Sequence, residues 1–295
     1  MSKTWLSAAL VLALGPLTVA AQEYAIKLKR PGLGDKTRTE VTDDFKLEFK
    51  IADNNGNVVM EAQETKTHKF VFREVGLERA AGSEDLVRLQ RQYEHAERRI
   101  KDVRETLPYQ GKTLFIEKKD GRFQFRIDGG DVLEGKEAEE LHEEFNKGDF
   151  RKLTTEHFLP RKTVKLNETW KYDVAALAKA FSGDGKIEID EAKSTGSGRL
   201  TKAYMKNGRQ FGIIELTIEF PVSHLDIDGN KAATKAGKLT IQLQADTCID
   251  GTLDDSRLKG TVTGDIRADV TINGMDLNVT ITLRANLAEQ RTLAK

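Results

Sequence analysis

Alternating apolar and polar positions are the clearest pattern in this chain, and they are strongest near its C-terminal end. From Met275 to Leu287, in "MDLNVTITLRANL", every odd-numbered residue is apolar or alanine and every even-numbered residue is polar. In "VTGDIRADVTI", residues 262–272, the non-polar side chains fall on even positions. A tight turn at Asn273-Gly274 would place both apolar sets on one face of an antiparallel pair. The predicted partners are Ile272 with Met275, Val270 with Leu277, Ala268 with Val279 and Ile266 with Ile281.

The same two-residue period recurs elsewhere and is separated by residues that favour tight turns. It appears in the segments 45–51, 123–127, 214–220 and 239–245. Asn-Gly and Asp-Gly pairs tolerate the positive φ angles of hairpin turns. They occur at 55–56, 120–121, 128–129, 184–185, 207–208, 228–229, 250–251 and 273–274. These patterns predict a mainly β fold of curved antiparallel meanders, similar to a half-barrel.

Two short helices are expected between the strands. One lies near residues 136–147 in "GKEAEELHEEFNKG", where Ala138, Leu141 and Phe145 share one side. The other lies near residues 174–181 in "DVAALAKAFSG", behind Asp173 as a possible N-cap.

Residues 84–107 are ambiguous between a helix and a long strand. Their apolar positions alternate three- and four-residue spacings, which is helical periodicity. These positions are Leu86, Leu89, Tyr93, Ala96, Ile100, Val103 and Leu107. The spacing alone favours a helix, whereas the flanking sequence favours a strand, so both remain open at this point.

The segment 153–173, which contains "HFLPRKTVKLNETW", is interpreted as a connection between two halves. Pro160 favours extended backbone before it, and Trp170 is expected to be buried, because a lone tryptophan usually packs. The expected organisation is an N-terminal β meander with a helix (22–152), this connecting segment, and a C-terminal helix with a β meander (174–295). The two halves are expected to pack as one unit.

The first residues have the order of a secretory signal peptide. Lys3 precedes an apolar run from Trp5 to Leu14, and small residues follow a Gly-Pro break. Cleavage near Ala21 is expected, which would leave an exported, periplasmic or extracellular chain. Nothing after it reaches transmembrane length.

Charge and cysteine content narrow the possible functions. The chain has 47 basic and 47 acidic residues, and loss of Lys3 with the leader leaves a net charge of −1. Such a balance does not predict nucleic-acid binding, which needs a basic face. Cys248 is the single cysteine, so it cannot form an internal disulfide, and a buried thiol is expected.

No motif predicts catalysis, a cofactor or a metal. The histidines never fall in metal-ligand spacing, and no nucleophile elbow, P-loop or dinucleotide-binding motif is present. His142 is interpreted as a solvated helix residue. Acid-rich turns could supply a carboxylate pair for hydrolysis, but nothing singles out one pair. These turn acids are Asp53, Asp128, Asp131, Asp226, Asp228, Asp254 and Asp255. The site residues for a ligand are therefore unknown from sequence.

The order of several segments resembles that of a group of uncharacterised, secreted bacterial β-proteins. The segments are "YQGKTLFIEKKDGRFQF", an acidic helix, "LPRKTVKLNETW" and "LTKAYMKNGRQFGIIELTIEF". In outline this group is similar to half-barrel proteins of the cell envelope, such as lipoprotein carriers. The resemblance implies a curved antiparallel sheet around one or two helices, and it favours a strand for 84–107. It carries over no functional residue, and this chain lacks the lipobox cysteine of many envelope half-barrel proteins.

Three functions remain as hypotheses. The first is a non-catalytic envelope protein that binds a lipophilic or extended ligand in a curved sheet. The second is a structural or interaction module that meets another envelope protein. The third is a hydrolase with an unidentified carboxylate site. The inner face of the sheet is expected to discriminate them, through an apolar cavity, a helix-filled concavity or a polar cleft with converging carboxylates.

Overall fold

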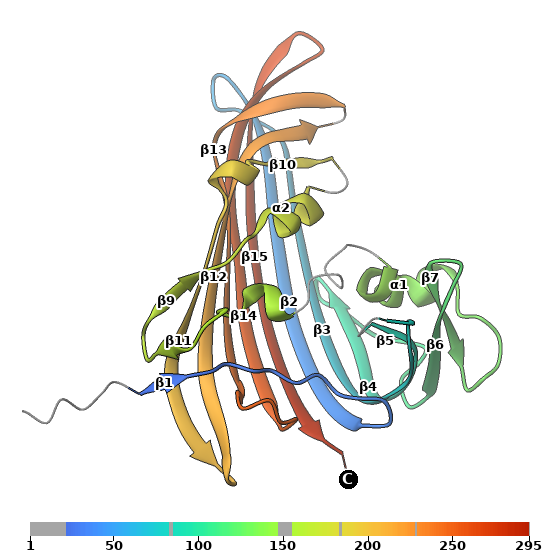
Figure 1. The fold of residues 1–295 in the computed structure, drawn as a ribbon. Helices are drawn as coiled ribbons and strands as arrows, with labels where there is room; N and C mark the ends of the chain where they lie inside the picture. The colour runs from blue at the N-terminus through green and yellow to red at the C-terminus, as the bar shows by residue number, and fades with distance from the viewer. Residues whose placement is uncertain (1–21, 83–84, 147–154, 183–184, 228, 295) are drawn as a thin grey trace, which may run out of the picture.

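One large, open antiparallel sheet dominates the protein. The structure is a computed structural model that describes residues 22–82, 85–146, 155–182, 185–227 and 229–294, so the expected signal peptide lies outside the described residues. The sheet has 13 strands in the order β7-β6-β4-β3-β2-β15-β14-β13-β12-β11-β9, with β10 on β12 and β5 on β4. It is strongly curved and does not close on itself (Figure 1). The prediction of a mainly β fold built from curved antiparallel meanders is confirmed.

The strands differ greatly in length. In chain order they are β1 (Glu23–Tyr24), β2 (Lys36–Asp53), β3 (Val58–Arg79), β4 (Leu86–Ile100), β5 (Val103–Thr106), β6 (Thr113–Lys119), β7 (Arg122–Ile127), β8 (Val164–Lys165), β9 (Thr169–Lys171), β10 (Ile187–Ile189), β11 (Thr195–Lys206), β12 (Arg209–Ile227), β13 (Asn230–Cys248), β14 (Ser256–Ile272) and β15 (Met275–Leu293). β1 and β8 form a small sheet of their own.

Strands from the two halves of the chain lie next to each other in the large sheet. β2 pairs with β15, from Asp53 opposite Leu277 to Thr37 opposite Leu293. This long ladder joins the first long strand to the last one, so the sheet is continuous across both halves.

The C-terminal hairpin has the register that its alternation predicts. Val270 lies opposite Leu277, Ala268 opposite Val279, and Asn273 and Gly274 form the turn with positive φ angles. Val279 is 1% exposed, so the predicted apolar face is the buried one. The Asp-Gly pair at 120–121 and the Asn-Gly pair at 207–208 also have positive φ at both residues, between β6 and β7 and between β11 and β12.

Residues 86–106 form the strands β4 and β5, so the helix that the apolar spacing favours is wrong. A register shift at Glu94 places Phe72 opposite Tyr93 and Phe70 opposite Ala96. This bulge changes which residues face inward and produces a three-residue spacing inside a strand. Arg91 and Arg98 also face inward, at 5% and 2% exposure, and their charge disguises the strand alternation.

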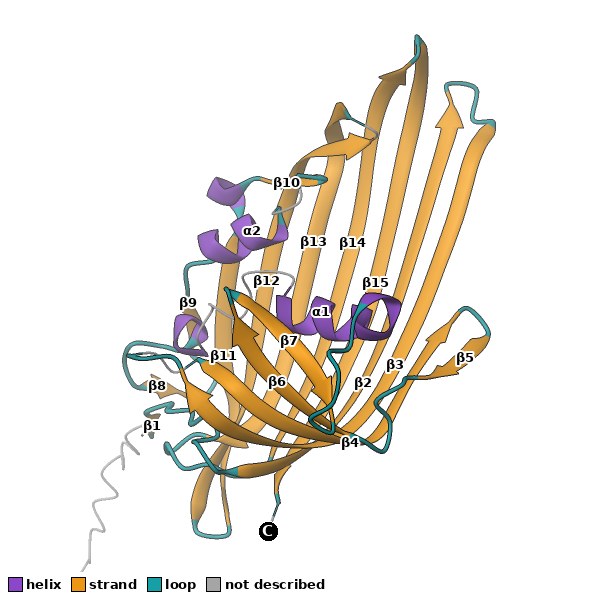
Figure 2. Cartoon of the chain, turned by 90° about the vertical axis from the view of Figure 1, so that its right-hand side faces the viewer, coloured by secondary structure: helices purple, strands orange, loops and turns teal. Residues whose placement is uncertain are grey.

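Both helices lie on the inner side of the curved sheet (Figure 2). α1 (Glu139–Asn146) follows a 3-10 turn (Gly135–Ala138), and α2 is Ala175–Phe181. They are the two α-helices within the described ranges, close to the predicted positions, although residue 147 lies outside those ranges. The Asp173 carboxylate accepts a hydrogen bond from the Ala175 N–H at 2.9 Å, which confirms its capping role.

The connecting segment is anchored by Trp170 on β9. Two further 3-10 turns, Thr155–Phe158 and Glu191–Lys193, flank this part of the chain. The Trp170 indole is buried, and its Nε1 donates to the Phe158 carbonyl at 2.8 Å. A Cβ on Gly198 would approach the indole to 2.3 Å, so glycine is what lets the ring lie on β11. The predicted packing role of Trp170 is confirmed.

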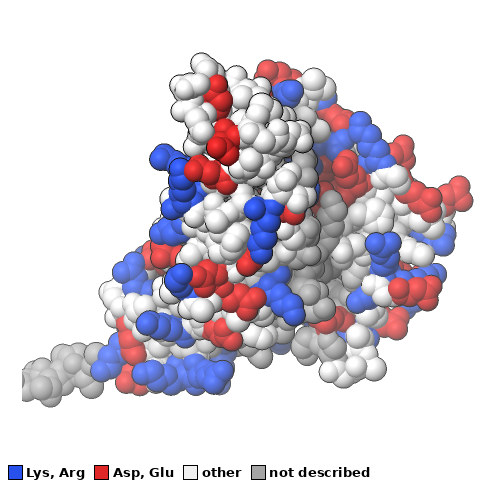
Figure 3. Space-filling model, turned by 90° about the horizontal axis from the view of Figure 1, so that it is seen from above, with Lys and Arg blue, Asp and Glu red and all other residues white. Residues whose placement is uncertain are grey.

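The two faces of the sheet differ in polarity. Buried aliphatic side chains of β12 to β15, Ile51 of β2, and Leu177 and Ala178 of α2 form one core on the inner face. The outer face carries exposed ion pairs, such as Arg284 with Asp265 and Lys238 with Glu219. Seen from above, acidic and basic side chains are interspersed over the surface (Figure 3).

Candidate functional site

A large cavity lies between the inner face of β2–β4 and the unit formed by α1, β6 and β7. Its volume is about 1250 Å³. This is above the usual range of about 300–1,000 Å³ for small-molecule sites. α2 packs against the other half of the inner face, so one half of the concavity is filled and the other is hollow. The cavity is therefore the candidate ligand site.

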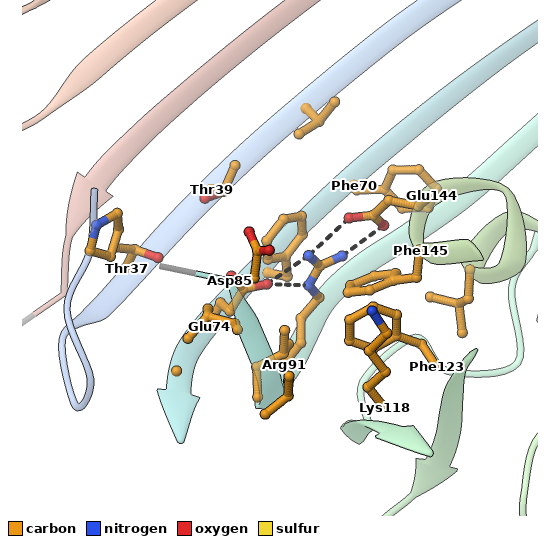
Figure 4. Close-up of a pocket in the computed structure, with 18 of the residues that line it drawn as sticks. Thr37, Thr39, Phe70, Glu74, Asp85, Arg91, Lys118, Phe123, Glu144 and Phe145 are labelled. Carbon is orange, nitrogen blue, oxygen red and sulfur yellow. Dashed lines mark hydrogen bonds and ion pairs between the residues drawn. The ribbon is translucent and has the colours of Figure 1, made fainter. Parts of the chain in front are cut away.

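Aromatic side chains form one part of the cavity wall. Phe70 and Phe72 come from β3, where the two-residue period places both on the inner face. Phe123 at the start of β7 and Phe145 on α1 lie opposite them, with their ring centroids 5.4 Å apart. Figure 4 shows Phe70, Phe123 and Phe145 around a central arginine. Aromatic side chains of this kind can pack against the apolar part of a ligand.

Arg91 is the arginine at the centre of the close-up, and it joins β4 to α1. Its Nη1 and Nη2 donate to the two carboxylate oxygens of Glu144 at 2.9 and 3.0 Å. Its Nε donates to Glu74 at 2.8 Å, and Nη1 also donates to the Tyr93 hydroxyl at 3.0 Å. The guanidinium lies 3.9 Å from the centre of the Phe72 ring, so an aromatic face covers the remaining side of the charge.

A second ionic cluster lies beside the first. His68 Nδ1 is 2.7 Å from Asp43, and its Nε2 is 2.9 Å from Glu140. Glu140 also pairs with Lys66 at 2.8 Å and with Arg98 at 2.7 Å. Glu140 is thus a carboxylate of α1 surrounded by three cationic groups of β3 and β4.

The helix geometry explains why both clusters meet α1. Glu140 and Glu144 are four residues apart, so they lie on one side of the helix and reach β3 and β4 together. Leu141 and Phe145 follow them by one residue each and are buried in the adjacent apolar core. α1 is therefore attached through one ionic stripe and one apolar stripe.

The pKa values of these groups are displaced away from neutrality. Burial alone would lower the pKa of His68, but hydrogen bonds and charges from Asp43 and Glu140 outweigh it and raise the pKa to about 9. Burial opposes ionisation of Glu140, yet hydrogen bonds from His68, Lys66 and Arg98 lower its pKa to about 2. Burial raises the pKa of Tyr93. At neutral pH, His68 is a cation and Glu140 an anion, and neither is poised to exchange a proton.

The residues that the sequence singled out do not converge on this cavity. Asp53 caps the β2–β3 turn by accepting from the Asn57 N–H at 2.8 Å, and Asp254 pairs with Arg209 at 2.9 Å. Asp228 lies outside the described residues. Among the residues that the structure describes, no group of three or more potential metal ligands comes together.

The burial of Cys248 and His142 tests two other interpretations of the sequence. Cys248 is buried, as expected, with its sulfur 3.2 Å from an Asp250 oxygen. His142, in contrast, is not fully solvated: its ring is half-buried and packs edge-on against Phe125 at 5.0 Å. Its interpretation as a solvated helix residue is therefore corrected.

Sequence reasoning missed His68 and Arg91, which line the cavity, and Arg98, which pairs with Glu140 beside it. A signal for them does exist. Each is a charged or titratable residue at an inward position of a strand, with an apolar or aromatic residue at a neighbouring inward position. That signal can be recognised only once the register of β4 is known.

Comparisons with known proteins identify no family for this chain. No family model matches it, and no curated protein matches it significantly. Solved structures align with it at very low similarity. An outer membrane channel from Pseudomonas putida aligns at 6% identity over 90% of this chain and 97% of the channel, with a TM-score of 0.22. A mutant porin of Rh. blastica aligns at 9% identity over 86% and 99%, with a TM-score of 0.16. TM-scores this low do not establish a shared fold.

Within the described part of the chain, every helix is too short or too polar to span a bilayer.

Proposed function

We propose that this protein is an exported, non-catalytic protein of the bacterial cell envelope that binds a lipophilic ligand in the cavity beneath α1. The observation that carries the proposal is the cavity itself, at about 1250 Å³ with Phe70, Phe72, Phe123 and Phe145 among the residues that line it. The hollow is held open between a curved sheet and a helix attached by buried ion pairs. An N-terminal segment with the order of a signal peptide supports export.

The chemistry of the cavity supports a binding role over hydrolysis. A glycoside-type hydrolase needs a carboxylic acid with a raised pKa beside an ionised carboxylate. Here the converging carboxylates, Glu74 with Glu144 and Asp43 with Glu140, are each held by a cation between them. Their negative charge is used to bind Arg91 and His68.

Ligand binding can be tested with a neutral lipophilic probe. We expect N-phenyl-1-naphthylamine to become fluorescent in the purified mature protein, and native mass spectrometry of protein from its own periplasm to show a lipid-sized added mass. Val41→Trp places an indole in the cavity and should abolish the fluorescence. Thr42→Trp is the matched control, because Thr42 is exposed on the outer face of the same strand. Equal dye binding by the two variants would refute this location for the site.

Export has its own test. N-terminal sequencing of the mature protein should find Gln22 or Ala21 first, because small residues follow the apolar run there. An intact Met1 on exported protein would contradict the proposal.

A second candidate function, an interaction module, is favoured by one feature of β3. Residues 58–64 are exposed, and β4 pairs with β3 only from Lys66 onward, so the described chain leaves this edge open. Open edges can accept a strand from another protein. A photo-crosslinker at Gln63, but not one at Lys259 on the outer face, should then give an adduct in the periplasm. No adduct at Gln63 would remove the support for this alternative.

A further inference from the structure

The acidic and basic side chains that line the cavity differ in their interaction partners. Every acidic residue that lines the cavity has a partner. Asp35 accepts from the Gly32 N–H at 2.7 Å, and Glu289 pairs with Arg291 at 2.8 Å. Asp43, Glu74, Glu140 and Glu144 belong to the ionic clusters, and Asp85 and Glu143 also have partners.

Two of the basic residues that line the cavity lack an acidic partner in the described part of the chain. Among the described residues, neither Lys118 nor Arg122 has an acidic partner, although both line the cavity. They flank the tight turn between β6 and β7. Asp120 at this turn does not line the cavity. These two cations therefore lie beside one turn at the cavity wall.

The position of Lys118 in β6 is informative. Leu114 and Ile116, at the preceding alternate positions, are fully buried in the core under α1. Lys118 continues this inner row, so a cation stands where the alternation would place another apolar residue. Its Nζ lies 5.7 Å from the centre of the Phe123 ring. Lys118 itself is exposed, so a cation lies beside an aromatic side chain at the exposed end of this row, where both line the cavity.

We infer that the ligand of this cavity is an anionic amphiphile, whose carboxylate or phosphate group binds Lys118 and Arg122 while its apolar chain lies against the phenylalanines. This inference rests on the proposed ligand-binding function and adds the charge and the orientation of the ligand. An anion at this wall gains two charge-assisted interactions and displaces no existing ion pair. A cationic group there would meet like charge.

The test uses dodecyl compounds that differ only in their head groups. Dodecanol, dodecanoate, dodecyl phosphate and dodecyltrimethylammonium, each below its micelle concentration, compete for bound N-phenyl-1-naphthylamine. We expect the two anions to displace the dye at roughly tenfold lower concentration than dodecanol, and added salt to reduce this advantage. A stronger response to dodecyl phosphate than to dodecanoate assigns the site to a phosphorylated head group, and the reverse assigns it to a carboxylate.

A double variant locates the effect. Lys118→Gln with Arg122→Gln should reduce the advantage of the anions to about twofold or less and leave displacement by dodecanol unchanged. Lys119→Gln with Arg126→Gln is the matched control, because both residues lie on the same two strands but do not line the cavity. The control should keep the full advantage.

The outcomes separate this inference from the function on which it rests. Dye and dodecanol that bind without any preference for anions, or an equal loss in both double variants, would overturn the inference and leave the proposed function intact. If neither the dye nor any dodecyl compound binds, the proposed function fails and this inference fails with it.

Discussion

Raising the pH should weaken the attachment of α1, because His68 contributes to stability as a buried cation. The imidazole side chain is 12% exposed and lies between Asp43 and Glu140. Its pKa rises from the ordinary 6.5 to about 9 in the folded protein. A difference of this size corresponds to about 3 kcal/mol of folding free energy at low pH. Because the folded pKa lies above the unfolded one, this contribution is complete below pH 6.5 and is lost as the pH rises through 9.

Urea unfolding at several pH values measures this loss. The free energy of unfolding of the wild-type protein should exceed that of His68→Gln at pH 6, and the difference should shrink by about 3 kcal/mol by pH 10. Other groups titrate in this range as well, but they do so in both proteins and cancel in the difference. His224→Gln is the control, because His224 lies 3.6 Å from Glu188 and 3.2 Å from Ser223 and does not line the cavity.

A direct titration gives the same answer without unfolding. The ring resonances of His68 should move with a midpoint near pH 9. A midpoint near 6.5, or a stability difference between wild type and His68→Gln that does not change with pH, would refute the assignment of His68 as a buried cation.

Three further predictions concern the sheet and the absence of a metal. Val279→Asp should cost several kcal/mol by burying a carboxylate, whereas Thr280→Asp should be nearly neutral; equal losses in urea unfolding would contradict the register. Gly198→Ala should cost roughly 1–3 kcal/mol, because its Cβ would meet the indole of Trp170; an unchanged urea midpoint would contradict this contact. A chelator should leave the melting temperature unchanged, and a fall of about 5 °C or more would indicate a bound metal.

The sequence predicted the parts of the fold in which one local rule acts alone. The β14–β15 hairpin is correct residue by residue, because a one-residue slip would expose its whole apolar face. The burial of Trp170 follows from the size of its side chain. Neither required knowledge of a distant neighbour. The pairing of β2 with β15, which joins the two ends of the chain, has no comparable local signal and was left undecided.

The cavity could not be predicted for the same reason that the apolar spacing of β4 favours a helix. The inward positions of β4 include Leu89, Arg91 and Tyr93 before the bulge, and Ala96, Arg98 and Ile100 after it. If Arg91 and Arg98 are assumed to face solvent, the remaining apolar residues of β4 have helical spacing. Their partners on α1 are far away in the sequence, so nothing local shows that a charge can be buried there. The misleading helical spacing and the missed site thus have one cause.

The buried charges also explain how a cavity can persist beside a hydrophobic core. Replacing a buried ion cluster with well-packed apolar residues is often neutral or stabilising, so stability alone does not require Arg91, Arg98 and Glu140. Apolar side chains at these positions would pack inward and fill the space between α1 and β3. Ion pairs instead hold α1 at a fixed distance through directional contacts, while Leu141 and Phe145 attach its other side to the core. The phenylalanines of β3 are then left facing an open volume, which is the arrangement that a lipophilic ligand needs.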